Sequence, residues 1–413
     1  MALAVTATAC TGSTAEPSKP PPPTVSAPPA SIPTGRILTE LQLEALAGTV
    51  SRLRGLEFLE PVTVQLIDDA GFRARVSQLT AAPLEVTPAI QSSWLHLLGV
   101  LPDTQDTYSA TTRLIQTAAA FYDPSENRVL VRSSAGIDPY VESAVVHELV
   151  HALQHQHFGT PDRPWLDGDA GYVYTALVEG DANRITRLYI GELTGPREGA
   201  FEAGRQSASE DSVAVRDGTP GYVRDSLQMP AADGLGFLQS MSNAGIDELF
   251  ADIPGLTSLP PTSEALIDPN ADLTIPDVDL DPVAVFPYER LPVEGTLGAG
   301  RLRILLGGVL DPDTVTEAVD GWGADRLDIR VTPAGGDVVV AYAFTGDRVE
   351  DARQLAIAFE LFLGSSLASG AYGSVRIAEN RVLVLAASNR ALRDSLDELF
   401  AGFGDEIFTI GRR

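Results

Sequence analysis

The sequence predicts an α+β protein with two folded units. The first, over residues 36–270, is mainly helical with a small sheet, and the second, over 296–413, is a smaller α+β unit. Three observations predict this. The chain has 413 residues, 44% of them hydrophobic, which is enough for two cores. In much of the first unit, apolar residues recur three and four apart, as in amphipathic helices. The second unit twice repeats two short apolar runs followed by a helical pattern, which is typical of an α+β layer.

Apolar spacing and turn signals place the elements of both units. In the first unit, helices are expected at about 37–56, 68–79, 88–98, 139–158, 167–193, within 219–249 and at 263–267, and strands at 61–67, 118–122 and 128–132. The last two strands flank Asp123-Pro124-Ser125-Glu126-Asn127, which indicates a hairpin. In the second unit, strands are expected at 326–331, 338–342, 374–377 and 382–386, and helices at 351–363 and 391–400.

The amino terminus has features of an exported chain. Residues 1–9 are a lead of small and apolar residues that ends at Cys10, the one cysteine of the sequence. Ala7-Thr8-Ala9-Cys10 is similar to the lipobox of bacterial lipoproteins, although the lead is short, lacks a basic region and has alanine where leucine is usual. We expect residues 1–10 to be a lipoprotein-like signal remnant, and the protein to be exported and lipid-anchored at Cys10 on the outer face of the cytoplasmic membrane or on the cell surface.

Two segments have the composition of linkers. Residues 11–35 are mostly proline, serine, threonine and alanine, and cannot form a core. Residues 271–295 are rich in aspartate and proline and would join the two units. The net charge of −27 argues against nucleic acid and anionic membrane surfaces as partners. No later apolar run reaches the roughly eighteen residues that a transmembrane helix needs, so anchoring would rest on the lipid alone. A single cysteine excludes an intrachain disulfide and a cysteine-based metal site.

The expected helix at 139–158 contains His147-Glu148-x-x-His151. Residues four apart share a face of a helix, so the two histidines can bind one metal ion. The Glu148 carboxylate stands where it can take a proton from a metal-bound water. Asp138-Pro139 supplies an N-cap and a proline at the first helical position. The pattern predicts a zinc site with an adjacent general base.

The next expected helix supplies a third ligand, Glu179. The midpoint of the histidine pair is about nine residues from the end of its helix and Glu179 about ten residues into the next, which is about 13 and 15 Å from the turn. If the helices pack as an antiparallel pair, Glu179 arrives level with the histidines. Gly180 beside it would let the two helices approach closely. Asp181 or Asn183 could orient a ligand histidine, and Asn183 shares the face of Glu179.

A further histidine, His157, is an alternative third ligand. His157 follows His147 by ten residues, the spacing of the three-histidine metzincin pattern. That pattern has a helix-ending glycine where this chain has Gln154. With the helix continuing, His157 would lie about 9 Å along the axis from His151, too far to share its metal. His155, one turn beyond His151, is expected at the rim of the cleft.

With these residues in view, the chain resembles the gluzincin branch of zinc metallopeptidases. The match consists of His147-Glu148-x-x-His151 and Glu179 on the following helix. The chain is more closely similar to a group of exported bacterial and archaeal proteins, through residues 147–158, 178–182, 260–269 and 321–326. Asn183 stands where gluzincins usually have an acid, four residues after the glutamate ligand.

The resemblance implies a zincin-like metallopeptidase fold for residues 36–270, zinc on His147, His151 and Glu179, and Glu148 as general base. Gluzincins often add a tyrosine or histidine that donates to the oxyanion. The candidates for that role are Tyr172, Tyr174 and Tyr222.

The sequence therefore predicts a zinc-dependent peptidase that hydrolyses peptide bonds of a peptide or protein substrate with a zinc-bound water activated by Glu148. The strand at 118–122 would lie beside the cleft, where its open edge can pair with an extended peptide. The alternative is a non-catalytic surface lipoprotein that uses the same fold to bind a partner. A structural zinc usually has four protein ligands and needs no base, and both points favour the enzyme.

Overall fold

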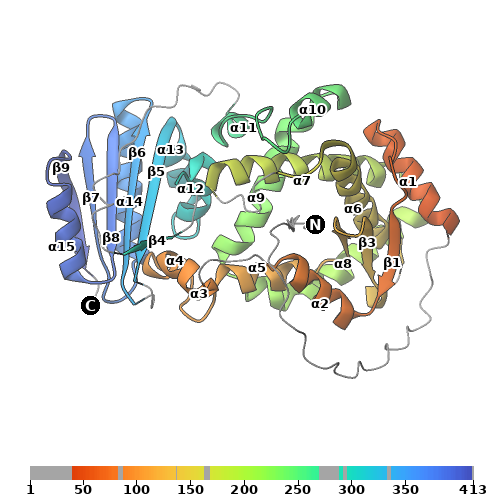
Figure 1. The fold of residues 1–413 in the computed structure, drawn as a ribbon, viewed down its shortest axis with the longest axis horizontal. Coiled ribbons are helices and arrows are strands. Elements are labelled where there is room, and N and C mark those ends of the chain that lie inside the picture. The colour runs from red at the N-terminus through yellow and green to blue at the C-terminus, as the bar shows by residue number, and fades with distance from the viewer. Residues whose placement is uncertain are drawn as a thin grey trace, which may run out of the picture.

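The computed structural model describes residues 40–81, 87–135, 137–161, 168–268, 288–291, 295–332 and 336–411. The expected signal remnant, the proline-rich linker and most of the 271–295 linker lie outside these residues. Helices with a small sheet form one end of the molecule, and a larger sheet forms the other (Figure 1). The protein is α+β, as predicted. Within the described residues, no helix is both long and apolar enough to span a membrane.

The helical part contains most of the predicted helices. Its helices are α1 (Glu40–Arg54), α2 (Asp69–Leu79), α3 (Pro88–Gln91), α4 (Ser93–Leu97), α5 (Thr107–Ile115), α6 (Pro139–Phe158), α7 (Gly168–Gly191), α8 (Pro196–Asp217), α9 (Gly221–Leu238), α10 (Asn243–Phe250) and α11 (Glu264–Ile267). The helix predicted at 88–98 is divided at Ser92 into α3 and α4. Helices α5 and α8 were not predicted. In α8 only Phe201 is buried, so the helix has no apolar stripe by which to recognise it.

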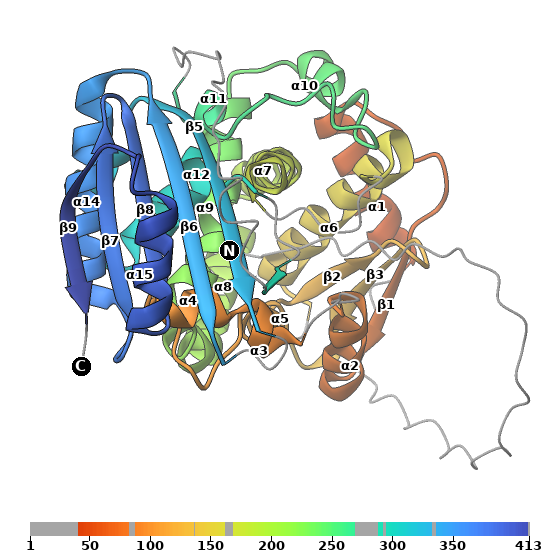
Figure 2. The same ribbon diagram turned by 60° about the vertical axis from the view of Figure 1, so that its left-hand side comes forward.

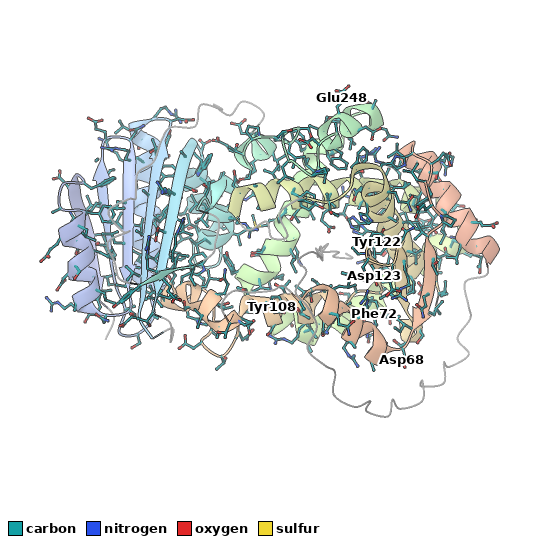
Figure 3. All side chains as sticks on the ribbon, viewed as in Figure 1. Asp68, Phe72, Tyr108, Tyr122, Asp123 and Glu248 are labelled. Carbon is teal, nitrogen blue, oxygen red and sulfur yellow. The ribbon has the colours of Figure 1, made fainter. Side chains whose placement is uncertain are left out.

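The small sheet has the order β1-β3-β2 and contains the predicted hairpin. Strand β1 (Thr63–Ile67) is parallel to β3 (Arg128–Arg132), and β2 (Ala120–Asp123) is antiparallel to β3. The N–H of Arg132 donates to Ala119 O at 3.0 Å, so alternate residues of β2 bond to β3 and the N–H of Tyr122 points to the other side. Figure 3 shows Tyr122 and Asp123 on this strand, far from the larger sheet.

The carboxy-terminal part is a six-stranded antiparallel sheet of order β4-β5-β6-β8-β7-β9. Its elements are β4 (Glu289–Arg290), α12 (Gly298–Gly307), α13 (Pro312–Val319), β5 (Trp322–Val331), β6 (Val338–Gly346), α14 (Val349–Ser366), β7 (Tyr372–Ala378), β8 (Arg381–Ala387), α15 (Arg390–Leu399) and β9 (Asp405–Gly411). Helix α14 packs on one face through residues such as Phe359, and α15 packs on the other through Leu396 (Figure 2). The six predicted elements are confirmed; β4, β9, α12 and α13 were not predicted.

The two parts share a core. One apolar cluster joins Trp94, Tyr172 and Tyr222 of the helical part to Phe344 and Phe359 of the sheet part. The sheet is therefore covered partly by helices that come some two hundred residues earlier in the chain.

Two of the segments that carry the family resemblance meet at the junction of these parts. The N–H of Ser263 donates to the carboxylate of Asp169 at 3.1 Å, where α7 begins. The carboxylate of Asp325 accepts from the N–H groups of Leu297 and Gly298, each at 2.9 Å. Gly298 has a φ of +71°, and a Cβ there would lie 1.8 Å from Asp169 Oδ1. These contacts give the two segments a structural role.

Candidate metal centre

Helix α6 begins and ends as its sequence predicts. The side chain of Asp138 accepts from the N–H groups of Tyr140 and Val141, each at 2.9 Å, and Pro139 occupies the first helical position. The helix ends at Gly159, which has a φ of +75°. It therefore continues past Gln154, and both histidines of the motif lie in its buried middle.

The structure brings the three predicted ligands together. Nε2 of His147 is 3.1 Å from Nε2 of His151 and 3.3 Å from Oε2 of Glu179, and Nε2 of His151 is 3.7 Å from Oε1 of Glu179. All three side chains are buried, and one ligand atom from each lies within 4.8 Å of the others. Atoms at these separations can all lie about 2 Å from one point, which is the distance at which zinc binds imidazole and carboxylate. The donor set therefore fits a metal ion.

No second group of this kind occurs in the part of the chain that the structure describes. His157 lies outside the centre, because its Nε2 is 2.7 Å from the carbonyl oxygen of Glu57. His96 is 2.7 Å from the carbonyl oxygen of Gln105, which is an ordinary packing contact. The fold therefore does not bring His157 together with His147 and His151, as the three-histidine alternative would require.

Glu179 is level with the histidine pair, but the helices meet differently from the prediction. Helix α7 is seen end-on in Figure 2 and α6 runs across that view, so the two cross rather than lie antiparallel. Gly180 faces α9 instead of α6, since a Cβ there would be 2.4 Å from the backbone of Gly234. The prediction for Gly180 was wrong about its partner. The close approach fixes α9 behind the helix that carries Glu179.

Gln154 orients one ligand histidine. Nδ1 of His151 lies 2.8 Å from Oε1 of Gln154. The amide nitrogen of Gln154 faces two acceptors, the carbonyl of Val178 at 3.0 Å and Oδ2 of Asp181 at 3.3 Å. The glutamine must therefore present its oxygen to His151, and Nδ1 of His151 must donate. This tautomer leaves the lone pair of Nε2 for a metal.

Buried charged side chains connect Gln154 to the first helix, α1. Nε of Arg54 is 2.7 Å from Oδ2 of Asp181, and both side chains are fully buried. Arg54 NH2 is also 2.7 Å from Oδ1 of Asp247 on α10. Of the two predicted candidates, Asp181 supports the site through Gln154, whereas Asn183 is only half-buried. Gln154 and Arg54 were not predicted in this role, although the three-residue spacing from His151 to Gln154 was a signal.

The Glu148 side chain of α6 is bonded to the edge strand β2. Its Oε2 accepts from the N–H of Tyr122 at 2.8 Å, so that N–H of β2 is already bonded. Every residue of β2 is buried. The open edge expected for this strand is therefore covered at Tyr122. The other oxygen of Glu148, Oε1, is buried and has no hydrogen-bond partner.

Burial controls the ionisation of the centre. It lowers the pKa of His147 and of His151 to about 4, because an imidazolium would lose its hydration there. It raises the pKa of Glu179 to about 7 and that of Glu148 well above its usual range. The two imidazoles are thus neutral donors at ordinary pH, and the two buried carboxylates favour a cation between them.

A small, mostly apolar pocket adjoins His151. Its walls include Val178, Phe250 and Tyr174. His155 also lines this pocket, and its Nδ1 is 2.9 Å from the hydroxyl of Tyr122. Its expected place at the rim of the cleft stays a prediction. Of the three candidate tyrosines, Tyr174 is the one on this pocket.

The other two candidate tyrosines lie elsewhere. The hydroxyl of Tyr172 donates to Asp233, and the ring of Tyr222 packs against Trp94 in the shared core. Neither therefore faces the candidate centre.

No known protein family, curated protein or solved structure matches this chain. The case for a function therefore rests on the residues of the site.

Proposed function

We propose that the protein is a zinc-dependent peptidase of the gluzincin type. The observation that carries the proposal is a buried carboxylate with one unpartnered oxygen, Glu148 Oε1, next to a complete donor set of two imidazoles and a carboxylate. A site that only stabilised the fold would not need this costly buried group. A general base for hydrolysis does need it.

In this proposal each residue has a separate task. His147, His151 and Glu179 hold the metal, which supplies Lewis acidity and lowers the pKa of a water molecule. The N–H of Tyr122 anchors Oε2 of Glu148, so Oε1 is left to take the proton of the attacking water and pass it to the leaving amine. Gln154 keeps His151 in the tautomer that binds through Nε2.

Replacement of Glu148 tests the proposal. We expect the Glu148→Gln variant to bind one zinc ion per chain, as the unaltered protein does, because the ligand set is intact. Cleavage of a diverse peptide library should fall by at least about 100-fold, since the base is lost. Zinc content by atomic emission and library cleavage by mass spectrometry measure the two effects.

The other outcomes decide against the proposal. Zinc in both proteins with cleavage by neither would favour the second class, a non-catalytic surface protein with a structural metal. Absence of zinc from both would contradict the metal centre itself.

A further inference from the structure

A polar pocket lies along the same face of α6 as the ligand histidines. It is a hollow of about 840 Å³, its open mouth included, and its lining contains Arg205 and Arg216 of α8 together with Tyr140 of α6. Tyr140 precedes His147 by seven residues, or nearly two full turns, so both side chains leave the helix in the same direction. The pocket is therefore about 10 Å from the candidate centre along the helix axis.

The lining of the pocket differs from the molecule in its charged side chains. The chain contains 56 acidic and 29 basic side chains. Nevertheless, the pocket lining holds two arginines and no aspartate or glutamate. Ser209, Ser212 and Gln228 add further polar groups. A wall of this composition favours an anionic group with hydrogen-bond acceptors.

The two arginines keep donors for such a group. Arg216 is only loosely held, with Nε 3.9 Å from the carboxylate of Asp217 and NH1 3.5 Å from the hydroxyl of Ser209. Arg205 bonds to Glu202 through Nε at 2.8 Å, and both of these side chains are more than half exposed. Guanidinium groups in this state can turn towards a carboxylate and bind it through two parallel hydrogen bonds.

The distance from the pocket to Glu148 can also be estimated along the chain that leads into strand β2. Ala118 and Ala119 line the pocket and come three or four residues before Tyr122, whose N–H donates to Glu148. At about 3.3 Å per residue in an extended chain, the separation is about 10 to 13 Å. An extended peptide covers that distance with three or four residues. The length of three or four extended residues therefore matches the separation between the pocket and Glu148.

We propose that this pocket binds a carboxylate of the substrate, three or four residues from the cleaved bond. The carboxylate is either an aspartate or glutamate side chain or the carboxy terminus of the peptide. Arg205 and Arg216 recognise it, and they set specificity rather than take part in the chemistry. This inference rests on the proposed peptidase function, because only a peptidase would use the pocket as a substrate site. Binding of a carboxylate by the pocket can nevertheless be measured without cleavage.

The test is peptide binding to the full-length Glu148→Gln chain. Fluorescent nonapeptides of alanine and glutamine would carry one glutamate at each position in turn, with a free or an amidated carboxy terminus, and anisotropy would give their affinities. We expect peptides with a carboxylate at the right position to bind at least about tenfold more tightly than their neutral counterparts, which is a typical gain for charge-assisted pairing. The glutamate series and the comparison of free with amidated termini distinguish a side-chain carboxylate from a terminal one.

Variants connect this preference to the pocket. The Arg205→Gln/Arg216→Gln double variant should lose the preference, and Arg205→Glu/Arg216→Glu should transfer it to lysine-bearing peptides. Arg353→Gln is the matched control, because Arg353 is an exposed arginine on α14, paired with Glu350. It should bind as the parent does. Equal melting temperatures would show that the double variants are folded.

The outcomes separate this inference from the proposed function. Arginine-dependent binding without cleavage by the unaltered chain would support the pocket while contradicting the peptidase. Cleavage of the library with no preference for acidic peptides, or a preference that survives the double substitutions, would overturn the pocket alone.

Discussion

At the scale of single residues, the centre combines neutral imidazoles with two carboxyl groups whose pKa values are raised by burial. Glu179 has its pKa raised to about 7, whereas the pKa values of His147 and His151 are lowered to about 4. In the metal-free protein between these values, Glu179 carries a proton and the histidines do not. Metal binding must release the proton of Glu179, because only the carboxylate is a ligand.

This difference predicts the pH dependence of zinc binding. Below about pH 7 the association constant should fall about tenfold per pH unit, and above pH 7 it should level off as far as Glu179 controls it. Competition with a zinc chelator between pH 5 and 8 measures the slope. The Glu179→Gln variant should bind more weakly and show little pH dependence between pH 5 and 7. A flat profile in the unaltered chain would mean that Glu179 is not a ligand.

A second prediction concerns the residue that orients His151. Leucine at position 154 keeps the volume but removes the acceptor for Nδ1, so the Gln154→Leu variant should bind zinc about 10 to 100 times more weakly. Gln156→Leu is the control on the same helix, because the Gln156 side chain faces the backbone of Leu59 and Glu60 instead. Isothermal titration would measure both. Unchanged affinity in Gln154→Leu would remove Gln154 from the site.

The residues of the centre differ in how far the sequence predicts them. The histidines and Glu148 follow from helical spacing alone. The lengths of two neighbouring helices single out Glu179, although these helices cross rather than lie antiparallel. Gln154 is within the same helix, but its role depends on Asp181, which comes from another helix. Arg54 lies 127 residues before Asp181 in the chain, so only the tertiary fold reveals their contact.

At the scale of elements, the close packing of α7 on α9 supports Glu179 from behind. A Cβ at Gly234 would lie 1.6 Å from the carbonyl oxygen of Ala176, which is backbone and cannot move aside without separating the helices. Gly236, two residues later, is exposed and has no neighbour within 4 Å of a Cβ. Helix α9 thus offers a buried and an exposed glycine for comparison.

Alanine at these two positions should have opposite effects. The Gly234→Ala variant should lose about 3 kcal/mol or more of unfolding free energy, since overpacking at a backbone contact is not relieved by a side-chain rotation. It should also bind zinc less tightly, because α7 is displaced. The Gly236→Ala variant should gain up to about 1 kcal/mol from helix propensity. Urea unfolding measures both, and equal effects at the two positions would contradict the close packing.

The elements that sequence patterns predict are those with clear end signals and apolar stripes. Helix α6 has Asp138, Pro139 and Gly159 at its ends, and its bounds agree with the prediction. Helix α13 was not predicted, although it has a similar start signal: Asp311 is followed by Pro312, and the Asp311 side chain accepts from the N–H of Thr314.

At the scale of the whole molecule, the chain folds around a core that crosses the expected linker. Trp94 of α4 belongs to the same apolar cluster as Phe344 of the larger sheet. The backbone of Leu97 accepts a hydrogen bond from the N–H of Ala368 at 3.0 Å, and a Cβ at Gly99 would lie 1.7 Å from the carbonyl oxygen of Ser366. A linker identified from its composition at 271–295 could not reveal these contacts, because they join segments 250 or more residues apart.

This shared core predicts that the two parts unfold together. Far-UV circular dichroism and tryptophan fluorescence of the intact chain should report one coincident urea transition. Residues 296–413 expressed alone should remain unfolded, because Trp94, Tyr172 and Tyr222 no longer cover their apolar surface. A fragment that folds cooperatively by itself would show that the second unit is independent after all.

A pair of substitutions locates the coupling. The Trp94→Ala variant removes a large buried side chain from the helical side of the shared core, so it should lower the unfolding free energy by about 3 to 5 kcal/mol. Because the cluster is continuous, the variant should still unfold in a single transition, and its midpoint should lie at a lower urea concentration. Leu59→Ala is the control, since the Leu59 residue is 63% exposed and should change stability by less than about 0.5 kcal/mol. The Trp94→Ala variant could instead show two separated transitions, with the sheet part unfolding at the same urea concentration as in the unaltered chain. That result would show that α4 covers the sheet without coupling it to the helices of the candidate centre.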